Sequence, residues 1–395
     1  MSPNTNQILI TDVHTMGHLG VIRGLGNTGY AVIAMSHRTD SLGFKSSLPK
    51  NNVICPAYND PIFCDWLLTW LKENPIKTII PSEGFLWATR PIFDDISHLI
   101  PIQNEQDFIF KYINKYDYFE KLISSADKNV SAHIPKTLFI NQNNPAPAIN
   151  DIKQLPLPAF IKIDSTYSSI YESDQVIKVN SHKELFEKIS QLRTTTSFFS
   201  AQGYVPGTKA SVNLIQVNGK ILCYDMLLAE HESPYTGGLA SLRRSWRHEA
   251  MIKDAKIKAK HIGWNGVMMV EYRYDKSSDS FHLIEFNLRF WGALHLSLYH
   301  GVNFPLILVD NFLHKKITPI LRTNQNAISR NLTYETGHVL SYIKSPNKSL
   351  MKKLTKVLSF LINGLNPNIS SDTFYPGDRK LWIHELILVV RNLYK

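Results

Sequence analysis

The chain has 395 residues, enough for two or three domains of ~100–200 residues each. Hydrophobic residues make up 44% of it and charged residues 19%, a balance that excludes disordered and fibrous proteins. Lys and Arg outnumber Asp and Glu by 43 to 33, but residues 311–395 alone carry 13 basic and 4 acidic residues. Nearly all of the excess positive charge therefore lies in the last fifth of the chain.

The cysteines and the N-terminal residues indicate a reducing compartment. Cys55, Cys64 and Cys223 are too few, and too far apart, for a disulfide framework or a zinc site. Residues 1–7 lack the basic and apolar regions of a signal peptide, and no stretch reaches the ~18–20 apolar residues of a membrane span. We therefore expect a cytoplasmic protein.

Short apolar runs alternate with helical patterns over residues 1–110. This alternation is typical of βαβ units and predicts a parallel α/β domain. The predicted strands lie at 8–10, 31–35, 53–54 and 78–80, and the predicted helices at 19–25 and 63–71. Gly17, Gly20, Gly24 and Gly26 follow the first strand but lack the G-x-G-x-x-G spacing, which favours close packing over a dinucleotide site.

Residues 111–310 have an α+β pattern. Strands are predicted at 138–140 and 160–163, a capped helix at 181–192, and a hairpin that turns at Asn218-Gly219. Residues 231–246 are expected to form a flexible loop. Its Arg243 and Arg244 would either clamp a phosphate or carboxylate or belong to a solvated basic turn. His231 and Glu232 are candidate acid–base residues, although a surface role is the better interpretation.

Two strands at 267–274 and 281–290 carry the most informative pattern. Glu285, Asn287 and Arg289 share one strand face, because alternate residues of a strand point the same way. If the apolar sets of both strands are buried together, Glu271 pairs with Glu285 directly or on the diagonal. Two facing carboxylates repel each other and require a cation, and these hard oxygen ligands suit Mg²⁺. The guanidinium of Arg289 can bind a phosphate or carboxylate through two parallel hydrogen bonds.

The segments Val270-Glu271-Tyr272 and Ile284-Glu285-Phe286-Asn287-Leu288-Arg289 resemble the metal-binding core of the ATP-grasp superfamily, of the carbamoyl phosphate synthetase and biotin carboxylase type. The resemblance implies a pre-ATP-grasp domain at 1–110 and two ATP-grasp subdomains at 111–200 and 201–310. It also implies a role for each of several residues. Mg²⁺ would be held by Glu271, Glu285 and Asn287, ATP phosphates by Lys115 and Lys162, and adenine by Gln202, Gly203, Tyr204 and Val205.

Two features depart from that family. The loop at 164–169, after the strand lysine, contains no glycine, so it is a weaker backbone site for anions. Thr208-Lys209 stands where the family has an acidic residue for ribose, which leaves the ribose contact open.

Residues 311–395 are predicted to be a basic, mainly helical extension. Leu350, Leu354, Val357, Leu361 and Leu365 recur on one helical face, and residues 382–393 form a second apolar helix. The helix at 349–365 is expected either to dock on the protein with its lysines outward or to lie on an anionic membrane surface. We expect no nucleic acid, because aromatic and basic residues are not interleaved.

The function that the resemblance implies is an ATP- and Mg²⁺-dependent ligase. A carboxylate would become an acyl phosphate, and an amine would then displace phosphate to form an amide. Arg289 would stabilise the acyl phosphate, and Arg243 would assist it. An NAD-type oxidoreductase built on the first domain, and a non-catalytic nucleotide-binding module recruited by the basic tail, are the alternatives. A homodimer is a further expectation.

Overall fold

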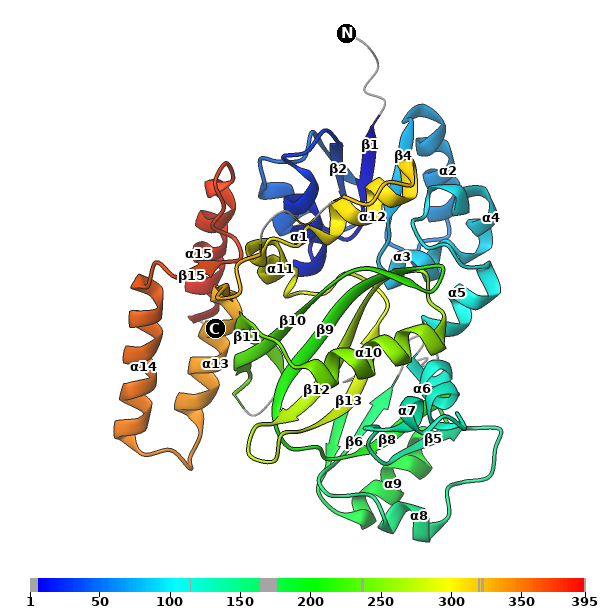
Figure 1. The fold of residues 1–395 in the computed structure, drawn as a ribbon, viewed down its shortest axis with the longest axis vertical. Helices are drawn as coiled ribbons and strands as arrows, with labels where there is room; N and C mark the ends of the chain where they lie inside the picture. Colours follow the sequence, from blue (N-terminus) through cyan, green and yellow to red (C-terminus); the bar gives the residue numbers. More distant parts are fainter. Residues whose placement is uncertain are drawn as a thin grey trace.

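The structure is a computed structural model that describes residues 6–113, 115–163, 176–235, 238–318, 320 and 323–393. The loop at 164–169 lies outside these residues. Three sheets organise the chain (Figure 1), and in the described part of it no helix is both long and apolar enough to cross a membrane.

The first sheet is parallel throughout, as the alternating pattern predicted. Its strand order is β3-β2-β1-β4, so the first strand lies in the interior and the chain crosses over on both sides of it. The segments that follow β1, β2 and β4 therefore meet at the carboxyl edge of the sheet. The elements are β1 Gln7–Ile10, α1 Met16–Leu25, β2 Ala31–Ser36, β3 Asn51–Ile54, α2 Phe63–Glu73, β4 Ile76–Ile80 and α3 Glu83–Ala88.

The glycines of α1 serve close packing, as expected, but their partner is the second half of the chain. A Cβ atom on Gly17 would lie 3.0 Å from the carbonyl oxygen of Phe290, and one on Gly20 would lie 3.0 Å from Leu294. These positions face α11 (Leu294–His300) and its preceding turn. The first domain is thus held directly against the chain that follows the predicted metal strands.

The second sheet is small and antiparallel, with the order β5-β8-β6-β7. Helix α9 packs on it and begins where predicted, because the Ser181 side chain accepts a hydrogen bond from the Glu184 amide. This part of the chain contains α5 Gln106–Tyr112, α6 Lys115–Ile123, α7 Lys128–Ser131, β5 Thr137–Asn141, α8 Ile149–Lys153, β6 Ala159–Ile163, β7 Val176–Val179, α9 His182–Leu192 and β8 Phe198–Gly203.

The third sheet has seven strands in the order β13-β12-β9-β10-β11-β14-β15 and forms the centre of the molecule (Figure 1). The predicted hairpin turns at Asn218-Gly219, where both residues have positive φ, of 48° and 72°. Helix α10 packs against β9 of this sheet. The elements are β9 Thr208–Val217, β10 Lys220–Ser233, β11 Leu239–Ser245, α10 Glu249–Ile262, β12 Gly266–Asp275, β13 Ser280–Asn287 and α12 Phe304–His314.

The segment at 231–246 is not the flexible loop that we expected. Its first residues extend β10, and Leu239–Ser245 forms β11, which pairs with β10 on one side and with β14 on the other. A strand hydrogen-bonded on both edges is not free to close over a ligand. Thr236 and Gly237 lie outside the described residues.

Residues 311–395 are part of the third sheet as well as a helical extension. Strands β14 (Ile328–Arg330) and β15 (Ile369–Ser371) complete that sheet. Helices α13 (Leu332–Lys344), α14 (Leu350–Leu365) and α15 (Arg379–Leu393) lie beside it (Figure 1). The residue-310 boundary falls inside α12.

Of the two arrangements expected for the helix at 349–365, docking with its lysines outward is not the one that the structure shows. Helix α14 contacts α13, but its leucines point to solvent, and Lys356 is the side chain that turns inward. The amphipathic pattern correctly predicted a helix with one apolar face. It could not show which face the rest of the protein covers.

Candidate functional site

The predicted pair of strands forms a hairpin in which Glu271 lies directly opposite Glu285. Glu271 comes from β12 and is 7% exposed. Its Oε1 atom lies 3.0 Å from the Nζ atom of Lys209 on β9, the neighbouring strand. The ammonium of Lys209 therefore supplies part of the positive charge that the two facing carboxylates require.

A chain of polar contacts continues from Glu285 to the first domain. The Asn287 Nδ2 atom donates a hydrogen bond to Glu285 Oε1 at 2.9 Å, and Arg289 Nη2 donates to Asn287 Oδ1 at 3.4 Å. The Nε atom of the same arginine lies 3.3 Å from Glu83 Oε2, at the start of α3. Arg289 therefore joins the hairpin to the carboxyl edge of the parallel sheet.

Lys162 brings the small sheet to the same hairpin. Its Nζ atom donates to Gln202 Oε1 at 2.9 Å and to the Ile284 carbonyl oxygen at 3.3 Å. The expected strand lysine, the expected adenine segment and the metal strand β13 thus converge, although 122 residues separate Lys162 from Ile284. Lys115 begins α6, as predicted, but its side chain lies outside the described residues.

The segment from Gln202 to Val205 leads out of β8 and connects the two ATP-grasp subdomains that we predicted. Gln202 is buried, and its Nε2 atom donates to Thr137 Oγ1 at 3.1 Å. The amide of Gly203 donates to the Lys136 carbonyl at 3.1 Å, and a Cβ atom at this position would lie 2.4 Å from Pro156. Tyr204 follows with 46% of its surface exposed, and Val205 is partly buried. The first two residues of this segment are therefore fixed by contacts with the small sheet and its neighbouring loops.

One cluster was missed by the sequence analysis. Asp12 follows β1 with a φ of 45°, is 5% exposed, and has an Oδ1 atom that accepts no hydrogen bond from the described residues. The Nδ1 atoms of His14 and His37 lie 3.8 and 3.9 Å from that oxygen. The hydroxyl of Ser82 donates to Asp12 Oδ2. Burial lowers the pKa of His14, against the charge of Asp12, which raises it.

The positions of these residues in the sequence could have indicated the cluster. Asp12, His37 and Ser82 each come just after a predicted strand of one parallel sheet, and the carboxyl ends of such strands share an edge. A small cavity lies beside it, lined by residues of both parts of the chain, Pro81, Ser82, Glu83, Leu288 and Arg289 among them. The cluster and the hairpin therefore face one another across Glu83 and Arg289.

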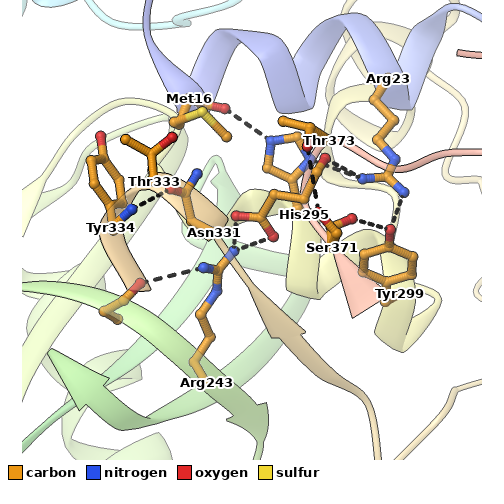
Figure 2. Close-up of polar contacts among 12 residues, drawn as sticks. Met16, Arg23, Arg243, His295, Tyr299, Asn331, Thr333, Tyr334, Ser371 and Thr373 are labelled. Carbon is orange, nitrogen blue, oxygen red and sulfur yellow. Dashed lines mark hydrogen bonds and ion pairs between the residues drawn. The ribbon is translucent and has the colours of Figure 1, made fainter. Parts of the chain in front are cut away.

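The prediction that Arg243 acts on a phosphate or carboxylate ligand is wrong. Arg243 is 1% exposed, and its Nη2 atom forms a buried ion pair with the carboxylate of Asp372, 2.5 Å from Oδ1. Figure 2 shows this network, in which Arg23 of α1 contacts Tyr299 and His295 contacts Met16. Arg243 is a structural residue that attaches the C-terminal segment to the third sheet.

His231 and Glu232 also have structural roles. His231 Nδ1 donates to Glu335 Oε1 of α13 at 2.6 Å, and its Nε2 atom lies 3.2 Å from Lys356 Nζ. These two contacts fix the imidazole between α13 and α14. Glu232 is buried, not on the surface as we expected, and accepts from Arg273 Nη1 at 2.7 Å and from the Lys209 amide at 3.1 Å. Both residues are occupied within the fold.

The chain matches one family model and has a fold similar to that of several solved structures. Residues 201–334 match the family model "ATP-grasp in the biosynthetic pathway with Ter operon", a range that includes the β12–β13 hairpin. No match is found among curated protein sequences. Among solved structures, the chain is similar to an L-amino acid ligase from Bacillus licheniformis, with a TM-score of 0.56 and 15% identity over 79% of this chain and 75% of that one.

Two further structures have a similar fold. A biotin carboxylase from Campylobacter jejuni, in complex with a β,γ-ATP ligand, has a TM-score of 0.60 and 14% identity over 82% of this chain and 74% of that one. An N5-carboxyaminoimidazole synthase from Aspergillus clavatus, bound to ADP and 5-aminoimidazole ribonucleotide, has a TM-score of 0.60 and 15% identity over 83% and 82%. The expected resemblance is confirmed: the chain has the α/β and α+β architecture of the ATP-grasp ligases.

Proposed function

We propose that the protein is an ATP- and Mg²⁺-dependent ligase that activates a carboxylate as an acyl phosphate and joins it to an amine. The observation that carries the proposal is the hairpin pair Glu271 and Glu285, with Asn287, Arg289 and Lys162 around it. The similar folds of an L-amino acid ligase and of two nucleotide-bound enzymes support the same class of reaction.

The nucleotide would lie between the small sheet and the hairpin. Tyr204 and Val205 would contact adenine, with Gln202 and Gly203 fixing the backbone beneath it. Lys162 already lies against β13, so its ammonium would reach phosphate oxygens above the metal strands. Lys115 would approach the phosphates from the start of α6.

The residues present fit a magnesium ion. One face of the β12–β13 hairpin carries three side chains with hard oxygen ligands, those of Glu271, Glu285 and Asn287. Mg²⁺ would complete its coordination shell with water and substrate phosphates. The ion would neutralise phosphate charge and polarise the γ-phosphoryl group. Asn287 orients Glu285 by donating to its Oε1 atom, and Lys209 holds Glu271.

In the first step the substrate carboxylate attacks the γ-phosphorus, the bond to the β-phosphate oxygen breaks, and ADP leaves. In the second step an amine attacks the acyl carbon, an amide bond forms, and inorganic phosphate leaves with the electron pair of the broken C–O bond. Phosphoryl transfer of this kind needs mainly positioning and charge neutralisation. Arg289 is placed to stabilise the acyl phosphate, because its guanidinium lies between the hairpin and the cavity.

The amine would bind at the carboxyl edge of the parallel sheet. Asp12 offers a buried carboxylate oxygen that lacks a hydrogen-bond donor among the described residues, and an ammonium or amine N–H would satisfy it. His14 and His37 are close enough to take the proton that the amine must lose before or during attack. The carboxylate would then occupy the space beside Arg289.

Hydroxylamine trapping of acyl phosphate, across a pool of carboxylates with Mg-ATP, tests the first step. Glu285→Gln keeps the size of the side chain but removes its charge, so we expect acyl hydroxamate and ADP formation to fall by ~10²-fold or more. Glu249→Gln, an exposed change on α10, is the matched control. A folded Glu285→Gln protein with near wild-type turnover would contradict the proposed role of the hairpin.

A second variant separates the two steps. Asp12→Asn should leave acyl phosphate formation near the wild-type rate, because Asp12 does not touch the hairpin residues that handle phosphate. Amide formation with the natural amine should fall by ~10²-fold, the scale of losing a buried charged contact. If both half-reactions fell equally, Asp12 would not be the amine site. If neither half-reaction is detected with any carboxylate, the non-catalytic alternative is favoured.

A further inference from the structure

Helix α14 exposes one continuous apolar face. Seven aliphatic side chains on it are between 56% and 86% exposed, and at 100° per residue they fall within an arc of about 120°. They are Leu350, Met351, Leu354, Leu358, Leu361, Ile362 and Leu365. Figure 1 shows α14 at the outer margin of the molecule, with α13 as its neighbour.

The opposite face of α14 is fixed to the protein by polar and aromatic contacts. Lys356 Nζ lies 3.2 Å from His231 Nε2, and the guanidinium of Arg330 stacks 4.7 Å from the centre of the Phe360 ring. The same arginine donates to the Phe360 carbonyl at 3.4 Å. Rotating the leucines inward would break these contacts, so their exposure is a stable property of the fold.

The exposed charge around this face is positive. Residues 311–395 contain four acidic residues, Glu335, Asp372, Asp378 and Glu385, and each is at most 2% exposed. No acidic residue occurs in 345–371, which carries four lysines. Lys352 of α14 is exposed, as is Lys344 at the end of the neighbouring α13. The acidic side chains of this segment are buried. Among its described residues, the exposed charged side chains are therefore all basic.

From these observations we propose that α14 is an interfacial helix that lies in the plane of an anionic lipid bilayer, with its aliphatic face in the acyl region. An aliphatic arc flanked by lysines matches the chemistry of such a surface. Two copies of this face would bring like charges together, which disfavours a dimer through α14. A nucleic acid would contact the lysines through its phosphates but would leave the apolar arc exposed to water, whereas a bilayer covers both.

Helix α15, which lies on the same side of the molecule as α14 in Figure 1, has a second exposed apolar row. Ile383, Ile387 and Val390 follow the i, i+4, i+7 spacing and are 50–54% exposed. An enzyme attached in this way would act on substrates delivered at the membrane. The residues of the proposed ATP site all precede position 290 and lie outside α14 and α15. Membrane binding and turnover of a soluble substrate should therefore be separable.

Vesicle flotation with the full chain tests the proposal. Wild type should float with vesicles rich in phosphatidylglycerol and much less with pure phosphatidylcholine. Leu354→Asn with Leu358→Asn should lower binding by at least ~10-fold, because two exposed side chains lose their transfer into lipid. Ile54→Asn with Ile62→Asn, equally exposed aliphatic residues of the first domain, is the matched control and should bind as wild type.

A charge variant tests whether the lysines contribute to binding at an anionic surface. Lys344→Gln with Lys352→Gln should weaken binding to anionic vesicles by ~10-fold or more and flatten its dependence on salt. Thermal melting should show that every variant folds. Absence of wild-type flotation, or equal loss in the Ile54/Ile62 control, would overturn the proposal. Light scattering that shows a dimer which the Leu354/Leu358 variant dissociates would overturn it in favour of self-association.

Discussion

Lys209 changes the chemistry expected at Glu271. The sequence placed a lysine where the family has an acid for ribose, and the structure turns that lysine onto the predicted metal ligand, 3.0 Å from its Oε1 atom. The ammonium relieves the repulsion between Glu271 and Glu285 before any metal binds. At the proposed site, a magnesium ion would therefore share Glu271 with Lys209 or displace it.

We expect Lys209→Met to reduce the Mg²⁺ concentration needed for half-maximal ADP formation. Removing a partly buried competing cation is worth on the order of 1 kcal/mol, about a fivefold change. Lys220→Met is the control, because Lys220 is an exposed lysine beside the turn of the β9–β10 hairpin that also contains Lys209. A loss of turnover at saturating Mg²⁺, with no change in the Mg²⁺ requirement, would show instead that Lys209 contacts the nucleotide.

At the scale of elements, the strands β11, β14 and β15 show how the C-terminal segment is held. Arg243 of β11 forms its ion pair with Asp372, the residue after β15, and Arg23 of α1 donates to the Asp372 carbonyl at 2.7 Å. Arg23 also stacks 3.6 Å from the centre of the Tyr375 ring. Three segments far apart in the sequence meet at one buried residue, Asp372, through its carboxylate and its main-chain carbonyl.

We expect Asp372→Ala to lower the free energy of unfolding by about 3–5 kcal/mol, because it leaves the Arg243 guanidinium buried without its counterion. The double variant Arg243→Met with Asp372→Leu should recover most of this loss, since no uncompensated charge remains. Urea denaturation measures both. An Arg243→Ala protein of wild-type stability that has lost turnover would restore the catalytic interpretation of Arg243.

At the scale of the whole molecule, two histidines are buried near the contact between the first domain and α11, and one of them, His295, joins the two. Burial lowers the pKa of His18 to about 4 and that of His295 to about 3. His295 Nδ1 lies 3.1 Å from Arg23 Nη1, and its Nε2 atom lies 3.2 Å from the Met16 carbonyl. Because guanidinium can only donate, the folded protein holds this imidazole neutral, with its proton on Nε2.

This neutrality makes stability depend on pH. Above pH ~6.5 both imidazoles are neutral in the folded and the unfolded chain, and their contribution is fully present. As the pH falls below that value, only the unfolded chain takes up protons, so the folded state loses up to ~1.4 kcal/mol per pH unit for each histidine. The loss continues until the folded pKa values are reached.

Urea denaturation at pH 7 and pH 5 measures this effect. Wild type should be several kcal/mol less stable at pH 5, and His295→Gln should show a smaller difference, whatever its stability at pH 7. His98→Gln on the surface controls for the substitution itself. An identical pH difference in wild type and His295→Gln would mean that this histidine does not carry the acid sensitivity.

The features that the sequence determined by itself are local or periodic. The parallel first domain, the Asn218-Gly219 hairpin and the pairing of Glu271 with Glu285 all follow from alternation of apolar residues and from turn chemistry. A one-residue shift would have moved the apolar side of β12 or β13 to solvent. The pattern therefore limited the pairing to even steps, and the structure shows the direct pairing of Glu271 with Glu285, followed by a shift in register after Glu271.

Only the tertiary structure decided which face of each element the protein covers. Arg243, expected at a ligand, is buried by Asp372, 129 residues further along the chain. The leucines of α14, equally suited to docking, remain exposed because Lys356 and Phe360 make the inward contacts. The amphipathic period of a helix records that its two faces differ, but burial is decided by distant segments, and their contacts leave no periodic trace in the local sequence.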